Sequence, residues 1–585
     1  MTRNADKLQN VALGTAPADL VVTNGRVLLP ESRRIVDREI AVETDRIAAV
    51  TTDASDVTGP ETTVVDATGK VVTPGFVNAH VHVDSFQPFE RAYHRVLATG
   101  TTAVVTEICE FGSCFGEPGV RQLLEATADL PIRVFGTVPP QAFLDAFSVG
   151  YDQFDDTDRE ELSALLQEDR IVGIGEIPWI QLVGRSSPAE SLAARARALG
   201  KTVSGHGAGC SGRRLTALAA TITDDHEMVS SEEVAERLEN GIHSIGRYGT
   251  FRDDIDALAD AYERFGSAEL SLSTDWIWPT DIVTEGYMDA VVRRAIEAGI
   301  DPVDAVRMAT LNPARHFGLP DIGSLSPGSR ADIIVLDDLE DVAVETVISG
   351  GEIVVDGGTP IVEPRSHTYP EWFRDSISLS LDEGALRVPT ADGSDGTVRA
   401  IHCEGGTVTS EATVEPAIAD GEFVATPDRD ALKVGLFDRS PSGVGDGFTG
   451  FLSGFGLEAG AVATSHTWQT PGVIAVGADE DAMRRSIADV IEMGGGWAVR
   501  GHETTRVTFP TPIGARCAGR DISETAEKMA DVSSALRELG ARLEEPALIL
   551  QALSFTGVPS LRMSFSGYED VFARETVGTD PACDR

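Results

Sequence analysis

Basic residues are scarce in this sequence. Only 48 Lys and Arg stand against 93 Asp and Glu, so the 585 residues carry a formal net charge of −45. Nucleic acids and anionic membrane surfaces are bound through clustered cations, and we expect neither as a partner. The acidic residues are spread along the chain, which is typical of a halophile's cytoplasmic protein whose self-repulsion is screened by salt. An acidic mesophilic enzyme is the alternative.

Cysteine and long apolar runs are also scarce. Six cysteines without a Cys-x-x-Cys pair exclude a disulfide framework in so long a chain. No uninterrupted apolar run approaches the roughly 18 residues of a membrane span. Residues 1–18 form a polar leader without the apolar centre of a signal peptide. With 42% hydrophobic and 24% charged residues, we expect a soluble intracellular protein, located in the cytoplasm, with more than one domain.

Strand and helix patterns divide the chain into segments. Short alternating strands with turn residues fill residues 19–74 and return at 319–382, and we expect these two segments to form one small β-sandwich. Between them, residues 75–318 alternate apolar strands with amphipathic helices, which predicts a TIM-like (β/α)₈ barrel in the α/β class. A linker rich in Ser, Asp and Gly, residues 383–398, precedes a predicted α/β domain over 399–585.

Polar side chains stand at the ends of the predicted barrel strands, where catalytic groups lie in such barrels. The stretch GFVNAHVHVDSF places His80 and His82 two residues apart, so both imidazoles share one strand face. Four further strand ends supply polar residues in GIGEIP, VSGHG, TDDHEM and LSLSTD, namely Glu176, His206, His226 and Asp275. Each has an ordinary structural explanation alone, but together they predict a site for one or two divalent metal ions.

These motifs resemble the adenine deaminase family of the amidohydrolase superfamily over about residues 19–565. PGFVNAHVHVDSF is similar to that family's Pro-Gly-Phe-x-x-x-His-x-His start. GEIP stands at its Gly-Glu-Met, where Glu takes the place of the carbamylated lysine of many other amidohydrolases. GHGAGCSGRRL, DDHEMVSSEEVAERLENG and the C-terminal GFTGFLSGFGLEAGAVATS also follow the family.

The resemblance implies a barrel, a β-sandwich and a C-terminal α/β domain. It also implies metal-dependent hydrolysis of adenine to hypoxanthine and ammonia, a purine salvage reaction, with Mn²⁺ or Fe²⁺. In that reaction a metal pair bridged by Glu176 provides hydroxide for attack on C6, and Asp275 shuttles the proton to the leaving amine. Glu227 either protonates a ring nitrogen or only supports the neighbouring His226. The substrate is then a small molecule, and a homo-oligomer is compatible with the sequence.

Two segments beside the predicted barrel depart from the family's pattern. The family's Asp-Pro-His-Glu after its second strand corresponds here to EICE, residues 107–110, and we interpret Cys109 as a small buried core residue in preference to a metal ligand. Its Asp, Arg and His before a proline correspond to Trp276, Ile277 and Trp278. We expect Trp276 and Trp278 to bind the substrate by stacking on a planar heterocycle.

Two further departures concern polar contacts. The family's His-Asp-Ser-His-Asn in the C-terminal domain corresponds to WQTPG, residues 468–472, so we expect its ligands and polar contacts to be missing. The family's Asp before the first His is Asn78 here. Lost hydrogen-bonding groups alter substrate discrimination, and the identity of the heterocycle therefore stays open.

Two alternatives remain at this stage. One is a related hydrolase that acts on another aminated heterocycle or a cyclic amide. The other is a non-catalytic paralogue that binds a metal or ligand, although such a protein has no need of a proton shuttle at Asp275. We interpret four further histidines as structural or surface residues: His94, His243, His316 and His466.

Overall fold

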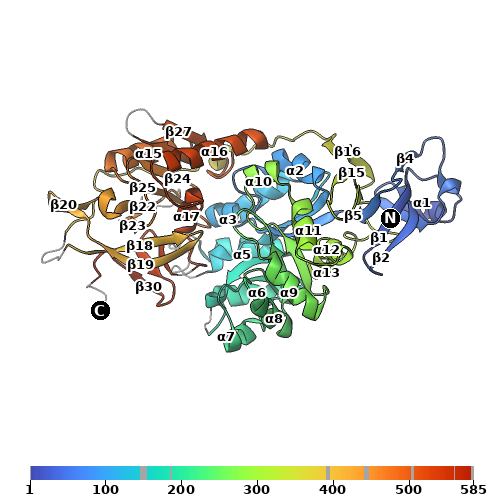
Figure 1. Cartoon of the computed structure of the whole chain (residues 1–585), viewed down its shortest axis with the longest axis horizontal. Coiled ribbons are helices and arrows are strands. Elements are labelled where there is room, and N and C mark those ends of the chain that lie inside the picture. The colour runs from blue at the N-terminus through green and yellow to red at the C-terminus, as the bar shows by residue number, and fades with distance from the viewer. Residues whose placement is uncertain are drawn as a thin grey trace.

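The computed structural model describes residues 2–144, 154–184, 187–390, 396–440, 447–501, 506–558 and 560–581. Figure 1 shows three regions in a row: a sheet near the N-terminus, a central barrel and a C-terminal region at the opposite end. Residues 391–395 of the predicted linker lie outside the described residues. In the described part, no helix has both the length and the apolar character needed to cross a membrane. Its five cysteines are buried and free.

The barrel consists of eight parallel strands that follow one another in sequence order, as predicted. These strands are β6 (Phe76–Val81), β7 (Thr101–Thr106), β8 (Arg133–Val138), β9 (Ile171–Pro178), β10 (Thr202–His206), β11 (Asp224–Asp225), β12 (His243–Arg247) and β13 (Leu270–Ser273). Nearly all their residues are buried, as expected for parallel strands that are covered on both faces. The ring closes where the Asp275 backbone N–H donates to the His80 carbonyl at 3.0 Å.

Helices surround the barrel and alternate with its strands (Figure 1). They are α2 (Phe89–Ala98), α3 (Cys109–Ala126), α5 (Asp156–Ala164), α6 (Pro188–Ala198), α7 (Gly212–Leu218), α8 (Ser231–Glu239), α9 (Ile255–Phe265), α10 (Pro279–Thr284), α11 (Met288–Glu297), α12 (Pro302–Met308) and α13 (Leu311–His316). Side-chain caps fix several helix starts: Ser230 accepts from the Glu233 N–H, and Asp301 accepts from the Val303 N–H. Leu, Ile, Val and Ala on their inner faces fill the space between helices and strands.

The segments before and after the barrel form one nine-stranded sheet. Its strands are β1 (Leu20–Leu29), β2 (Arg34–Glu43), β3 (Arg46–Thr51), β4 (Thr63–Asp66), β5 (Val71–Pro74), β14 (Ile333–Leu336), β15 (Val344–Ser349), β16 (Glu352–Asp356) and β17 (Thr359–Pro360). The two segments join where β14 pairs antiparallel with β5. Within the predicted polar leader, α1 (Thr2–Ala12) packs against β3 through the buried Val11.

The C-terminal region is built on an eight-stranded sheet. In spatial order its strands are β19 (Val408–Val414), β18 (Val398–Gly405), β23 (Gly447–Ser453), β22 (Leu432–Asp438), β25 (Gly472–Gly477), β24 (Ala461–Thr464), β26 (Gly496–Arg500) and β27 (Arg506–Pro510). Helices α14 (Glu371–Arg374), α15 (Glu480–Glu492), α16 (Ile522–Glu538) and α17 (Pro546–Ala552) and the short strands β20 (Ala417–Ala419), β21 (Glu422–Val424), β28 (Leu561–Met563), β29 (Tyr568–Asp570) and β30 (Glu575–Val577) complete it. Helix α15 covers β24, β25 and β26.

The C-terminal region docks on the barrel at the end where the strands finish. The Phe86 backbone exchanges two hydrogen bonds with it: its N–H donates to the Arg516 carbonyl at 2.9 Å, and its carbonyl accepts from the Ala518 N–H at 2.8 Å. Trp276 and Trp278 pack into the same apolar cluster as Trp468, which lies between β24 and β25. Residues of the C-terminal region therefore face the mouth of the barrel.

Glu90 on α2 makes stability depend on pH at a position outside this mouth. Burial raises the pKa of Glu90 from 4.5 to about 7, although the Tyr369 hydroxyl, 3.2 Å from both carboxylate oxygens, favours the ionised form. The native state thus keeps a proton that the unfolded chain releases above about pH 4.5, and the free energy of unfolding falls as pH rises toward about 7. We expect Glu90 to account for about 3 kcal/mol of this decrease.

Denaturant unfolding of the wild type and Glu90→Gln across this pH range measures that contribution. The difference between the two proteins should change progressively with pH, with the variant becoming relatively more stable as pH rises. If the free energies of unfolding of the two proteins changed in parallel with pH, Glu90 would have the same pKa in the native and unfolded states, and the prediction would fail.

Candidate metal centre

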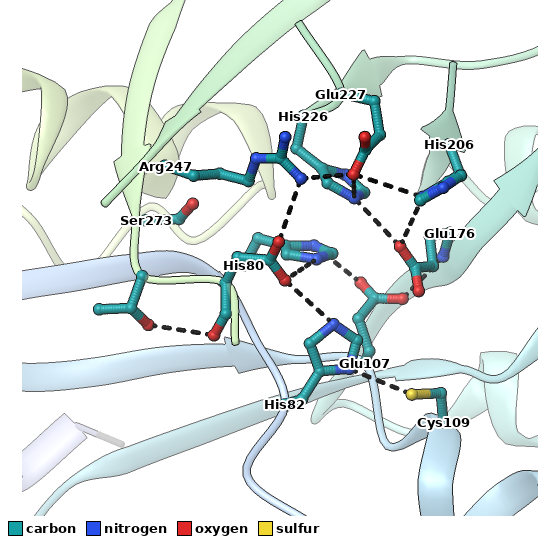
Figure 2. Close-up of polar contacts among 12 residues, drawn as sticks. His80, His82, Glu107, Cys109, Glu176, His206, His226, Glu227, Arg247 and Ser273 are labelled. Atoms are coloured by element: carbon teal, nitrogen blue, oxygen red, sulfur yellow. Dashed lines mark hydrogen bonds and ion pairs between the residues drawn. The ribbon is translucent and has the colours of Figure 1, made fainter. Parts of the chain in front are cut away.

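The six predicted ligands converge at the barrel mouth, together with Glu227. Figure 2 shows the side chains of His80, His82, Glu176, His206 and His226 pointing toward one another from different strand ends. In the part of the chain that the structure describes, three overlapping groups could each hold a cation: His80–His82–Asp275, His80–Glu176–His226 and His206–His226–Glu227. Within each group the candidate ligand atoms lie within 4.8 Å of one another. None of the seven residues is more than 8% exposed.

One half of the centre joins the first and last barrel strands. Asp275 Oδ1 lies 3.2 Å from His82 Nε2 and 3.5 Å from His80 Nε2. Asp275 adopts a left-handed backbone with φ of 53°, which turns the chain sharply after β13. Asn78 stabilises the turn, because its Oδ1 accepts from the Thr274 N–H at 3.2 Å and its Nδ2 donates to the Thr274 hydroxyl at 2.7 Å. The Asn at this position thus helps to place Asp275.

The other half is centred on Glu176. Its Oε2 lies 3.1 Å from His206 Nδ1 and 3.0 Å from His226 Nε2. The His226 ring stacks on the His80 ring with 3.9 Å between centroids, which joins the two halves. Glu227 Oε1 lies 3.7 Å from both His206 and His226. Glu176 is therefore the carboxylate that lies between two imidazoles.

The donor set fits one or two divalent cations. Buried ring nitrogens without a hydrogen-bond partner occur in all four imidazoles: His80 Nε2, His82 Nε2, His206 Nε2 and His226 Nδ1. Burial lowers the pKa of His206, but the Glu227 and Glu176 carboxylates outweigh it and raise the pKa to about 9. Imidazole nitrogens and carboxylate oxygens packed this densely suit Zn²⁺, Mn²⁺ or Fe²⁺ in their ligand chemistry.

Glu107 belongs to the centre, although the sequence reasoning did not assign it a role. Its Oε1 lies 3.3 Å from His80 Nδ1, and its Oε2 accepts from the Glu176 backbone N–H at 2.7 Å. His80 thus faces Asp275 with Nε2 and Glu107 with Nδ1, the arrangement in which a carboxylate orients a metal-ligating histidine. The available signal was its place directly after an apolar strand, the same signal that identified Glu176.

Replacing Glu107 by Gln should weaken metal binding by roughly 10- to 100-fold, because the amide no longer holds the His80 ring as a charged acceptor does. Calorimetric titration of metal-free protein with Mn²⁺ measures this loss. Glu569→Gln is a matched control, since Glu569 is also a buried carboxylate but lies in β29 of the C-terminal region. Unchanged Mn²⁺ affinity in Glu107→Gln would argue against the orienting role.

Cys109 and Arg247 also contact the predicted ligands. Cys109 is buried as predicted, but its Sγ lies 3.1 Å from His82 Nδ1 and therefore contacts the site. Arg247, at the end of β12, pairs with Glu227 and lies 3.2 Å from Asp275 Oδ2, while its Nε donates to Asp254 at 2.7 Å. Its guanidinium thus holds two site carboxylates in place, a role that the sequence reasoning missed.

A cavity of about 50 Å³ opens beside the centre. It is lined by Glu176, His206, Glu227, Arg247, Phe251, Arg252, Asp275, Trp276, Thr407, Trp468, Gln469, Phe555 and Val558. The Trp276 ring lies between His82 and Trp468, with centroids 4.4 Å and 5.2 Å away. Trp278 is not among the described lining residues; it packs between Phe86 and Phe251. Of the two predicted stacking residues, Trp276 reaches the cavity.

The WQTPG segment, predicted to lack the ligands and polar contacts of the family's motif, makes a polar contact of its own with the centre. Gln469 Nε2 donates to Glu176 Oε1 at 2.7 Å, a contact that the prediction did not include. The two residues are 293 apart in the sequence, and no local sequence pattern predicts their contact. Among the histidines interpreted as structural, His316 pairs with Asp224 at 2.8 Å and stacks on His243, and His466 contacts Thr511 at 3.0 Å.

Comparisons with known proteins cover both halves of the chain. The family model described as "Amidohydrolase family" matches residues 71–354, and "Adenine deaminase C-terminal domain" matches 406–575. A curated adenine deaminase of Methanothrix thermoacetophila is 32% identical over 567 residues, covering 96% of each chain. One from Moorella thermoacetica is 33% identical, covering 96% of each chain. One from Desulfatibacillum aliphaticivorans is 31% identical, covering 97% of this chain and 98% of its own.

Proposed function

Because the chain belongs to the adenine deaminase family, we propose that it hydrolyses adenine to hypoxanthine and ammonia. The main support is structural: four imidazoles and two carboxylates from five strand ends converge beside one cavity. This arrangement supports hydrolysis at an electrophilic ring carbon by an activated water. The near full-length similarity to curated adenine deaminases supports adenine as the substrate.

We assign the metal-binding role to His80, His82, Glu176, His206, His226 and Asp275. A divalent cation bound there lowers the pKa of a coordinated water toward neutrality. Mn²⁺ or Fe²⁺ is the proposed ion, in line with the family resemblance of the sequence. The acidic composition supports a cytoplasmic protein of a salt-adapted cell and argues against nucleic acid as a partner. A role in purine salvage follows from the proposed reaction.

Asp275 moves the proton in the proposed reaction. Burial would raise the pKa of Asp275, but His80 and His82 hold it well below the usual range, so the carboxylate is ionised before the substrate reacts. It takes the proton from water as the bond from oxygen to C6 forms, and delivers it to the exocyclic amine as the C6–N bond breaks. Water thus supplies the oxygen of hypoxanthine and the proton that completes ammonia.

The cavity walls orient the heterocycle. Glu227 lines the cavity and pairs with Arg247. We propose that its carboxyl group contacts a ring nitrogen of the substrate and also helps to orient His226. Trp276 lines the cavity with its ring packed between His82 and Trp468, and this gives the wall an apolar, aromatic character. Trp278 supports this wall from behind through its contacts with Phe86 and Phe251.

The test is an assay of purified Mn²⁺-loaded protein in high KCl with adenine, measuring hypoxanthine and ammonia together. Stoichiometric release of both supports the proposal. A panel of aminopurines, aminopyrimidines and cyclic amides runs in parallel. Turnover of another member in place of adenine identifies the related hydrolase, and absence of turnover across the panel identifies a binding protein.

A further inference from the structure

Gln469 is the residue through which the C-terminal region reaches the candidate metal centre. It lies between β24 and β25, 6% exposed, with a left-handed backbone of φ 54°. Its side-chain amide enters the cavity beside Glu176. A buried, conformationally strained position with a polar side chain at a functional site requires support from the surrounding structure.

That support comes from three hydrogen bonds, one to the Gln469 backbone and one to each end of its side-chain amide. The Gln469 backbone N–H donates to Glu110 Oε1 at 3.0 Å. Gln141 Nε2 donates to Gln469 Oε1 at 2.7 Å. Gln469 Nε2 donates to Glu176 Oε1 at 2.7 Å, and because an ionised carboxylate only accepts, this bond determines which side of the amide carries the nitrogen.

Glu110, the anchor of the Gln469 backbone, is itself held at the junction between barrel and C-terminal region. Arg516 Nε lies 3.0 Å from Glu110 Oε2, and both side chains are 1% exposed. Arg516 also donates to the Thr467 and Thr470 carbonyls, on either side of Gln469, at 2.6 and 2.7 Å. Docking of the C-terminal region therefore determines where the Gln469 amide lies.

We propose that Gln469 is a positioning residue by which the C-terminal region sets the orientation of Glu176 at the metal centre. The inference deepens the proposed function and rests on the metal-binding role assigned to Glu176. Gln469 donates to Oε1, whereas Oε2 faces His206 and His226. With one oxygen held by an immobilised amide, the plane of the carboxylate is fixed relative to the imidazoles. A charged carboxylate in a buried site gains more from such a bond than a neutral acceptor does.

The experiment uses Co²⁺ as the probe on full-length, metal-free protein. Gln469→Leu removes the donor and should weaken Co²⁺ binding by roughly 10- to 100-fold in calorimetric titration, as losses of such supporting partners do. The visible absorption bands of the bound Co²⁺ should also shift, because the carboxylate rotates. With adenine, kcat should fall more than KM rises.

Gln87→Leu is the matched control. Gln87 is another buried glutamine that joins barrel and C-terminal region, with Nε2 donating to the Arg520 carbonyl at 2.7 Å and Oε1 accepting from Thr525. Its loss weakens docking without touching Glu176, so Co²⁺ affinity and spectrum should stay as in the wild type. Where Gln469→Leu does not fold, Gln141→Leu should give a smaller loss in the same direction.

Wild-type Co²⁺ affinity and spectrum in Gln469→Leu would overturn the inference, as would equal losses in Gln469→Leu and Gln87→Leu. A wild-type protein that binds Co²⁺ but does not deaminate adenine refutes the proposed substrate alone, and the Co²⁺ comparison still decides the role of Gln469. A wild-type protein that binds no Co²⁺ overturns both the metal centre and this inference.

Discussion

Replacement of Asp275 by Asn should reduce adenine deamination by roughly 10²- to 10⁴-fold or more, the contribution of a positioned acid–base group. The amide cannot accept a proton, and it also removes the charge that pairs with His80, His82 and Arg247. Two functions are lost together, proton transfer and metal ligation, so the effect should lie at the upper end of that range. Steady-state kinetics with saturating Mn²⁺ measure it.

Asp304→Asn makes the same chemical change at a buried position outside the site. Asp304 on α12 accepts from the Tyr262 hydroxyl at 2.8 Å and the Ser267 hydroxyl at 3.0 Å, and it contacts no site residue in the described structure. This variant should keep wild-type kcat even if its melting temperature falls. Substantial activity in Asp275→Asn would contradict the proton-shuttle mechanism.

Removal of divalent ions should eliminate deamination and lower the melting temperature. A ligand that binds only the folded state stabilises it by about 2.7 kcal/mol when its concentration is a hundredfold above Kd. Chelation removes that stabilisation. The buried carboxylates then have only the neighbouring imidazoles to offset their negative charge. Thermal unfolding with chelator, and again after Mn²⁺ is restored, measures the shift alongside the assay.

Glu176→Gln separates this effect from general damage by the chelator. The variant lacks the carboxylate between His206 and His226, so its melting temperature should respond weakly to both chelator and Mn²⁺. An equal response in the variant and the wild type would place the stabilising ion elsewhere. Full activity after exhaustive chelation would refute metal-dependent hydrolysis.

The barrel and the principal site residues were predictable because both follow from local patterns. Apolar strands alternate with amphipathic helices, and parallel strands of a barrel bring their ends to one place, so His80, Glu176 and His206 could be assigned to one site from sequence. Glu107 and Arg247 carried the same strand-end signal. Their partners at the site, however, depend on side-chain direction, which no spacing rule specifies.

The contribution of the C-terminal region was not predictable by these means. Gln469 approaches Glu176 because contacts such as the Arg516–Glu110 ion pair set how the C-terminal region packs on the barrel. The tryptophans showed the same limit: Trp276 and Trp278 are two residues apart, yet a proline-initiated helix directly after Trp278 directs them to different surroundings. Docking and local turns, more than periodicity, determine which of them reaches the cavity.

The hydrogen bond from the Asp275 N–H to the His80 carbonyl has a mechanical meaning beyond closing the ring. The seam of the barrel, where the first strand meets the last, coincides with the ligands of the proposed cation. Asn78 and Thr274 at that seam are 196 residues apart in sequence, so joining them costs a large loop-closure entropy. A cation held by His80, His82 and Asp275 would link the first and last strands across this seam, so metal binding would stabilise the closed barrel as well as support catalysis.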